Sequence, residues 1–186
     1  MSSAKGYSIS IILDSKTENM VKGFWKSLHD MGLSDYYYLS RSRPQVPLLV
    51  LEETDEELCL AALQNFAHNV DSFCINLELT GMFTTSPSSV FWLPSPTREL
   101  LELHHALYKA VIPFSKIESS GYYNPDLWMP HLGLASYIKD LQYLPAIVKS
   151  TMVFPSAFKA MAKALMFSKF LPIEAIGFFP LKKYIK

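Results

Sequence analysis

The feature that most constrains this chain is a short pattern that occurs twice: a proline, then a polar residue, then an apolar run. One copy is residues 130–135 (PHLGLA), and the other lies within residues 43–52 (RPQVPLLVLE). A proline disfavours helix at the residue before it, and the alternation that follows His131 has the period of a strand. Gln45 opens one run as His131 opens the other. The sequence therefore predicts two similar strands, with Gln45 and His131 at matching positions.

Other segments keep a recognisable order between and around these two strands. Gly81-Met82-Phe83 leads into residues 90–94 (VFWLP), and residues 97–104 (TRELLELH) follow. Together with the two strands, they resemble the 2H phosphoesterase superfamily, which contains 2′,5′ RNA ligase-like and cyclic phosphodiesterase proteins. The resemblance extends from about Tyr7 to the end of the chain. In that family, each half of the fold contributes a strand with Pro-His-x-Thr or Pro-His-x-Ser.

The chain departs from the family pattern at three positions. Gln45 and Pro47 stand where the resemblance implies His and Thr, and Gly133 stands where it implies a second Thr or Ser. Of the four catalytic side chains that the family would supply, only His131 remains. A glutamine forms hydrogen bonds but cannot exchange a proton near pH 7. The resemblance therefore implies a degenerate first motif.

Hydrophobic periodicity and capping residues predict the order of strands and helices along the chain. Strands are expected over 7–13, 45–51, 73–79, 90–93, 131–135 and 173–181, and helices over 16–31, 55–70, 97–111, 141–152 and 156–168. This order predicts an α+β fold, a 2H phosphoesterase-like bilobal domain with two mainly antiparallel sheets facing a central groove and helices outside. Residues 1–186 are expected to form one domain with two pseudo-symmetric lobes.

Two segments have a less regular pattern. Tyr36-Tyr37-Tyr38-Leu39 fits either a short strand or an aromatic lid over a groove. Residues 113–130 are rich in Ser, Gly, Tyr and Pro and form the longest segment without a periodic pattern. Long loops of this kind are often binding loops, so we expect this one to border a site.

Composition limits the classes of function. Apolar residues make up 49% of the 186 and charged residues 18%, which is typical of a globular domain with a substantial core. Lys plus Arg equals Asp plus Glu at 17 each, so net charge gives no general case for nucleic-acid binding. Cys59 and Cys74 are expected to be buried thiols in a reducing cytoplasm. Neither a secretory leader nor an 18-residue uncharged apolar run occurs, so a cytoplasmic protein without a membrane span is expected.

Several cofactor classes lack their usual motifs. The sequence has no glycine-rich phosphate loop, Rossmann fingerprint or cysteine metal motif, which argues against a nucleotide triphosphatase, a dehydrogenase and a zinc protein. His104 and His105 are adjacent, whereas two ligands on one helical face need a spacing of three or four. We therefore expect no cofactor and no metal.

A phosphate site follows from the resemblance and from the residues near the two strands. His131 would act as acid or base, with Gln45 opposite it, and Pro47 and Gly133 would line the site. Candidate residues for stacking a base or ring are Trp128, Tyr122 and Tyr123, and candidate cations at the rim are Arg41 and Arg43. Two plainer interpretations stay open: Trp128 packs in the core, and His131 only caps the end of its strand.

Three functions are compatible with these residues. The first is a divergent 2H protein that binds a nucleotide or an RNA-end phosphate, with weak or no phosphodiesterase activity. The second is an active, metal-independent phosphodiesterase in which Tyr123, His104 or His105 replaces the missing histidine. The third is a protein-interaction module. The sequence does not determine the substrate or the oligomeric state.

Overall fold

The structure is a computed structural model that describes residues 6–40, 42–118, 120–138, 140–152, 158–170 and 173–183. Its strands are β1 (Gly6–Leu13), β2 (Gln45–Thr54), β3 (Cys74–Phe83), β4 (Ser88–Pro94), β5 (Ser115–Ile117), β6 (Leu132–Ile138), β7 (Phe158–Phe170) and β8 (Glu174–Pro180). Its α-helices are α1 (Ser15–Asp30), α2 (Tyr36–Leu39), α3 (Glu56–His68), α4 (Arg98–Val111) and α5 (Leu144–Thr151), with 3-10 turns at Ile112–Phe114 and Leu141–Tyr143.

The long strand β7 joins two groups of strands. Its residues 158–161 pair with β3, and residues from 162 onward pair with β1 and β8. The order across the sheet is β5-β2-β1-β7-β3-β4-β6, with β8 beside β7, and these strand pairs are antiparallel. One group is therefore β5, β2, β1, β7 and β8, and the other is β7, β3, β4 and β6. The predicted α+β class with mainly antiparallel strands is confirmed.

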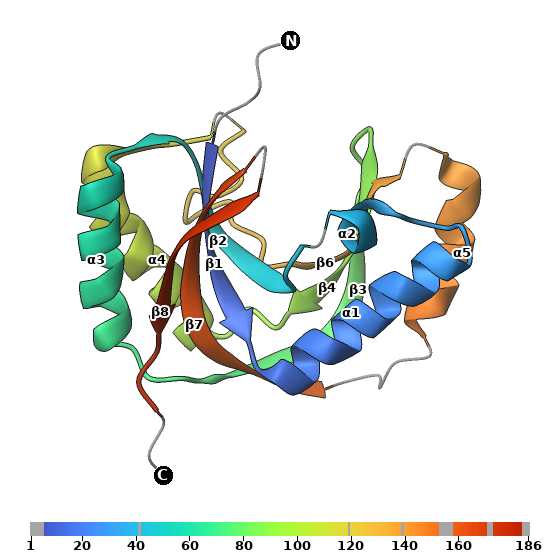
Figure 1. The fold of residues 1–186 in the computed structure, drawn as a ribbon, viewed down its shortest axis with the longest axis horizontal. Helices are drawn as coiled ribbons and strands as arrows, with labels where there is room; N and C mark the ends of the chain where they lie inside the picture. The colour runs from blue at the N-terminus through green and yellow to red at the C-terminus, as the bar shows by residue number, and fades with distance from the viewer. Residues whose placement is uncertain are drawn as a thin grey trace.

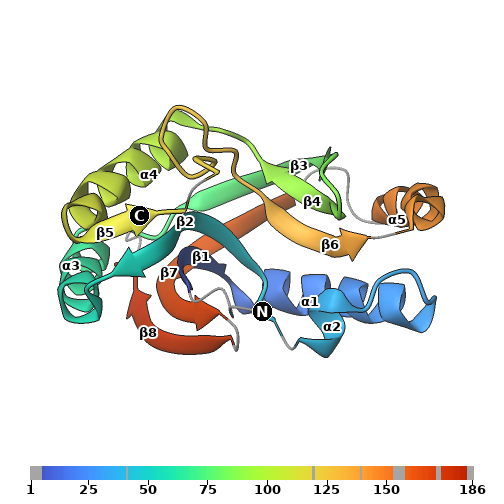
Figure 2. The same cartoon turned by 90° about the horizontal axis from the view of Figure 1, so that it is seen from above.

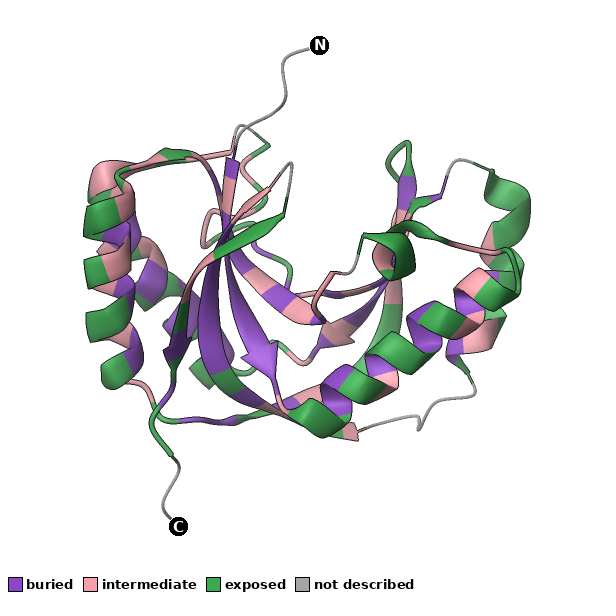
Figure 3. Cartoon of the chain, in the orientation of Figure 1, coloured by how far each residue is buried: buried purple, intermediate pink, exposed green. Residues whose placement is uncertain are grey.

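The helices cover the outer sides of the two groups. Helices α3 and α4 contact each other at one end of the molecule, and α1 and α5 lie at the other end (Figures 1 and 2). The buried residues of the helices form stripes that face the strands, while the opposite sides are exposed (Figure 3). In α1 the buried stripe includes Phe24, Trp25 and Leu28, as its apolar spacing predicts. The pseudo-symmetry of the two lobes stays a prediction.

The predicted helix over 156–168 is wrong, because this segment forms strand β7; residues 153–157 lie outside the described part. Its Ala, Leu, Met and Lys residues favour helix, and Phe158, Met161 and Leu165 have helical spacing. The structure instead buries both faces of the segment between neighbouring strands: Ala164, Leu165 and three flanking residues are almost inaccessible. Backbone pairing on both sides outweighs an intrinsic preference that spans only about 1 kcal/mol per residue.

Three smaller predictions are also corrected. Tyr36–Leu39 is a one-turn helix, so the strand alternative is wrong. The irregular segment 113–130 contains strand β5, which pairs with β2. Cys59 is buried as expected, and burial raises the pKa of its thiol to about 11, but Cys74 is exposed because its side chain points away from the core at the start of β3.

Among the described residues, no helix combines the length and apolar character needed to cross a membrane.

Candidate functional site

A cavity lies at the N-terminal end of strand β6. Its volume is about 140 Å³, and its lining residues are Phe83, Thr85, Tyr122, Tyr123, Trp128, Met129 and His131. This volume is close to that of an engineered cavity of roughly 150 Å³ that holds benzene. The cavity therefore has room for one ring or one phosphate group and leaves the rest of a nucleotide outside. Of the predicted site residues, it brings together His131, Tyr123, Tyr122 and Trp128.

His131 is half-buried and packs against two phenylalanine rings that also contact each other. Its ring centroid lies 5.2 Å from that of Phe83 and 5.6 Å from that of Phe91. Its Nδ1 lies 2.9 Å from the carbonyl oxygen of Met129. A carbonyl only accepts hydrogen bonds, so Nδ1 carries the proton and Nε2 of the neutral ring has a free lone pair. Burial lowers the pKa of His131, which outweighs the opposite effect of the Met129 carbonyl. The ring is thus neutral at physiological pH, which is the form that a general base needs.

Trp128 is held from two sides. Its ring stacks on His104 with a centroid separation of 4.0 Å and parallel planes, and its Nε1 donates to the carbonyl oxygen of Pro47 at 3.1 Å. Only 7% of Trp128 is exposed. One face of the ring is therefore already covered, which supports packing as its main role. The same hydrogen bond ties the segment before β6 to strand β2.

Two tyrosines form the open wall of the cavity. Tyr122 is exposed, with its ring 6.3 Å from that of Phe83, whereas Tyr123 is half-buried against the core. Burial raises the pKa of the Tyr123 hydroxyl, and the nearby Glu118 and Tyr37 raise it further. Tyr123 is consequently a neutral phenol at physiological pH, a form that can donate a hydrogen bond.

Gln45 and Pro47 lie on β2, outside the lining of this cavity. The register places Gln45 opposite Ile12 and Pro47 opposite Ser10, on the sheet face that does not carry Val46. Strands β2 and β6 are in contact, so the two motif strands are neighbours in space. The Oε1 atom of Gln45 is buried and has no hydrogen-bond partner among the described residues. An unmet buried acceptor costs about 1–3 kcal/mol unless a ligand or solvent supplies a donor.

Gly133 leaves a space on β6 that a tyrosine fills. A Cβ atom added at Gly133 would lie 1.9 Å from the hydroxyl oxygen of Tyr37 and 2.5 Å from its Cζ atom. The Tyr37 hydroxyl lies 2.8 Å from Oγ of Ser136, and the Tyr37 ring stacks on Trp25 at 4.7 Å. Trp25 in turn donates from Nε1 to the carbonyl oxygen of Gly133 at 3.1 Å. No side chain larger than hydrogen fits at Gly133 while Tyr37 is in place.

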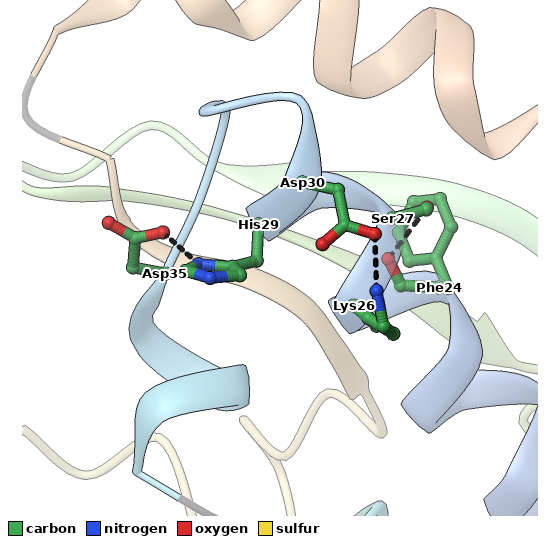
Figure 4. Close-up of polar contacts among 6 residues, drawn as sticks. All are labelled: Phe24, Lys26, Ser27, His29, Asp30 and Asp35. Carbon is green, nitrogen blue, oxygen red and sulfur yellow. Dashed lines mark hydrogen bonds and ion pairs between the residues drawn. The ribbon is translucent and has the colours of Figure 1, made fainter.

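The end of α1 fixes the position of α2. Nδ1 of His29 lies 2.7 Å from Oδ1 of Asp35, the residue before α2 (Figure 4), and the His29 ring stacks on Tyr38 at 4.5 Å. In the same region, Lys26 and Asp30 form an ion pair along α1 at 2.6 Å (Figure 4). The contacts of His29 with Asp35 and Tyr38 hold the short helix at the end of α1. The sequence predicted an aromatic segment here but not that Tyr37 would meet Gly133.

Of the two candidate cations at the rim, the structure describes only Arg43. Arg43 forms an ion pair with Glu18 through Nε, and its Nη2 lies 3.3 Å from the second carboxylate oxygen. Its guanidinium also lies 5.1 Å from the ring centroid of Phe178. The charge of Arg43 is thus already paired with a carboxylate, which weakens the case for a phosphate contact. Arg41 lies outside the described residues.

The two adjacent histidines of α4 lie on different sides of the helix, as their adjacency predicts. His104 is 1% exposed, and its Nε2 lies 2.9 Å from the carbonyl oxygen of Leu48. Burial lowers its pKa to about 4. His105 is exposed on the outer side of the helix. Neither lines the cavity, and no cluster of three or more His, Cys, Asp or Glu residues able to hold a metal occurs in the described part of the chain.

Several solved structures share this fold. TT0787 of Thermus thermophilus has 14% identity and a TM-score of 0.61, over 97% of this chain and 100% of that one. LigT of E. coli, solved with ATP, has 14% identity and a TM-score of 0.56, over 96% and 98%. A structure described as a phosphoesterase has 14% identity and a TM-score of 0.57, over 96% and 99%. At this identity the likeness shows the fold.

The amino-acid sequence of this chain matches a known protein family. None of the curated proteins matches this sequence. A family model described as the 2′-5′ RNA ligase superfamily matches residues 20–166, and this match agrees with the fold and with the resemblance to 2H phosphoesterases. Because the match covers most of the 186 residues, the chain belongs to the 2′-5′ RNA ligase superfamily.

Proposed function

We propose that this protein binds a nucleotide or an RNA end through its phosphate, between the two motif strands, and has weak or no phosphodiesterase activity. The observation that carries the proposal is the state of His131. Its ring lines an aromatic cavity, its Nδ1 is fixed by the Met129 carbonyl, and its unprotonated Nε2 can accept a hydrogen bond. Solved relatives bind related ligands: LigT of E. coli is described in complexes with ATP, with phosphate and with 3′-AMP.

The weak activity follows from what the other motif strand offers. Opening a cyclic phosphate or a 2′,5′ bond needs one group to remove a proton and another to donate one. His131 supplies one of them, and Gln45 supplies none. A positioned acid or base contributes about 10²–10⁴-fold to a rate, so its loss removes most of the reaction. The Oε1 atom of Gln45, which has no partner among the described residues, can only accept a hydrogen bond.

Calorimetry of 3′-AMP and 2′-AMP with the purified protein tests the binding proposal. We expect binding that weakens in His131→Ala and is unchanged in His105→Ala, a matched control at an exposed histidine. Binding should strengthen as pH falls, because the imidazolium attracts a phosphate, but only below about 6.5, since burial lowers the pKa of His131 from that ordinary value. It should weaken with salt, because exposed charges are screened within about 8–10 Å. No heat from folded protein would refute the proposal and favour a protein-interaction module.

Hydrolysis of 2′,3′-cyclic nucleotides tests the catalytic part. We expect a rate far below an ordinary turnover of about 1–10³ s⁻¹, and a gain in Gln45→His, which returns a proton-exchanging group to β2. One observation favours a second candidate, an active phosphodiesterase: Tyr123 lines the same cavity as His131 and is a neutral donor. Wild-type turnover in the ordinary range that is lost in Tyr123→Phe and His131→Ala would establish that alternative.

A further inference from the structure

The space at Gly133 holds a hydroxyl group from another element. In the family pattern, the residue two positions after the histidine is Thr or Ser, and its hydroxyl lies on the same face of the strand as the histidine. Here the Tyr37 hydroxyl oxygen lies 1.9 Å from where the Cβ of residue 133 would be. This separation is only slightly longer than a carbon–oxygen bond. The Tyr37 oxygen thus lies in the space that a side chain at position 133 would occupy.

This hydroxyl is in the correct protonation state to bind an anion. Burial raises the pKa of Tyr37 to about 12, so the group is a neutral O–H donor at physiological pH. Its oxygen lies 2.8 Å from Oγ of Ser136, and either group can donate in that pair. When Ser136 donates to Tyr37, the Tyr37 proton is free for a ligand.

Two observations place the hydroxyl on the side of His131. Phe91 on β4 pairs with Gly133 and also contacts the His131 ring, so Gly133 and His131 share that face of β6. A Cβ atom at Gly133 would point to this same face, and there it would meet Tyr37. Tyr37 and His131 therefore lie on the same side of β6, and Tyr37 lies beyond the residues that line the cavity.

The hydroxyl is also held rigidly. The Tyr37 ring stacks on Trp25 with an interplanar angle of 14°, and the His29–Asp35 contact at the start of α2 anchors the helix (Figure 4). A fixed donor loses little conformational entropy when a ligand arrives.

We propose that Tyr37 replaces the missing hydroxyl of the second motif and donates a hydrogen bond to a phosphoryl oxygen of the nucleotide beside His131. The inference rests on the proposed function and adds a binding residue that lies outside both motifs. A chain that lost its motif hydroxyl thereby keeps a donor for the phosphate, supplied by α2 in place of β6.

Calorimetry with 3′-AMP, inorganic phosphate and adenosine tests the proposal in wild type, Tyr37→Phe and Tyr38→Phe. Tyr37→Phe removes the hydroxyl and keeps the ring on Trp25. We expect 3′-AMP and phosphate to bind roughly 10- to 100-fold more weakly to Tyr37→Phe, the range for one hydrogen bond to a charged group. Adenosine binding should not change, because adenosine has no phosphate. Tyr38→Phe, at an exposed neighbour, should behave as wild type.

The outcomes separate the two proposals. Wild type that binds 3′-AMP, with equal or higher affinity in Tyr37→Phe, would overturn the role of Tyr37 and leave nucleotide binding intact. Tighter binding in particular would show that Tyr37 plugs the site. Wild type that binds no phosphate ligand would refute both proposals. Ser136→Ala is the second variant, and we expect a smaller loss of affinity, because Ser136 orients the Tyr37 proton without touching the ligand.

Discussion

Stability below neutral pH should depend on His104. In the folded chain, burial lowers the pKa of its imidazole from 6.5 to about 4, against the backbone contact with Leu48. Above pH 6.5 the ring is neutral in both the folded and the unfolded chain, so it adds no pH dependence. Between pH 6.5 and 4 the unfolded chain binds a proton that the folded chain excludes. Stability is therefore complete above the unfolded pKa and is lost as pH falls through this window.

The size of the loss follows from the two pKa values. One pKa unit corresponds to about 1.36 kcal/mol, so lowering the pH from 7 to 4.5 should reduce the free energy of unfolding by about 2.5 kcal/mol through His104 alone. Other groups titrate in the same range, so the comparison needs a variant that cannot titrate. His104→Gln keeps an amide that can donate to the Leu48 carbonyl and removes the ionisable ring.

Urea unfolding at pH 7 and at pH 4.5 measures this contribution. The decrease in the free energy of unfolding should be about 2.5 kcal/mol larger in wild type than in His104→Gln. His105→Gln is the matched control, because His105 is exposed on the adjacent position of α4, and its decrease should equal that of wild type. Equal decreases in wild type and His104→Gln would refute the argument that the folded chain excludes this proton.

Three further variants test contacts that position the site. Gly133→Ser should lower the free energy of unfolding by about 1–3 kcal/mol, because its Cβ overlaps Tyr37, and a Tyr37→Ala background should remove most of that loss in urea unfolding. Asp14→Ala should lower the free energy of unfolding in urea by about 1–3 kcal/mol, since Asp14 caps α1 and accepts a hydrogen bond from the backbone N–H of Met161 at 2.7 Å. An unchanged free energy of unfolding would refute this role. Gln45→Leu should unfold at the same or a higher urea concentration than wild type, because it removes an unpaired buried oxygen, yet should bind 3′-AMP more weakly.

Local patterns predicted most of the fold. The helices α1, α3, α4 and α5 agree with the predicted segments within a few residues, because each has an amphipathic period and most have a capping residue. Strand β7 was missed, because its neighbours β1, β3 and β8 come from distant parts of the chain and bury both faces. A segment of good helix formers gives no local signal of such pairing.

Only part of the candidate site could be predicted, because the local sequence does not show which distant residues meet in the fold. His131 and Tyr123 lie in or beside a motif, and the structure brings them to one cavity. Tyr37 lies 96 positions before Gly133, since 133 minus 37 is 96, and only the fold brings the two together. A glycine in place of the family hydroxyl, with a run of tyrosines elsewhere, is the one signal that the sequence offered. The pairing of Arg43 with Glu18 depends on α1 in the same way.

The two motif strands have diverged unequally, and this inequality underlies the proposed loss of activity with retained binding. On β6 the missing hydroxyl position is filled by the hydroxyl of Tyr37, beside a histidine that can still take up a proton. On β2 the histidine position carries an amide that accepts or donates hydrogen bonds but cannot transfer a proton. Binding a phosphate needs donors, and we propose that β6 with α2 provides them. Hydrolysis needs two proton-transfer groups on opposite sides, so we expect a substitution at Gln45 to change the rate, and a substitution at Tyr37 to change the affinity.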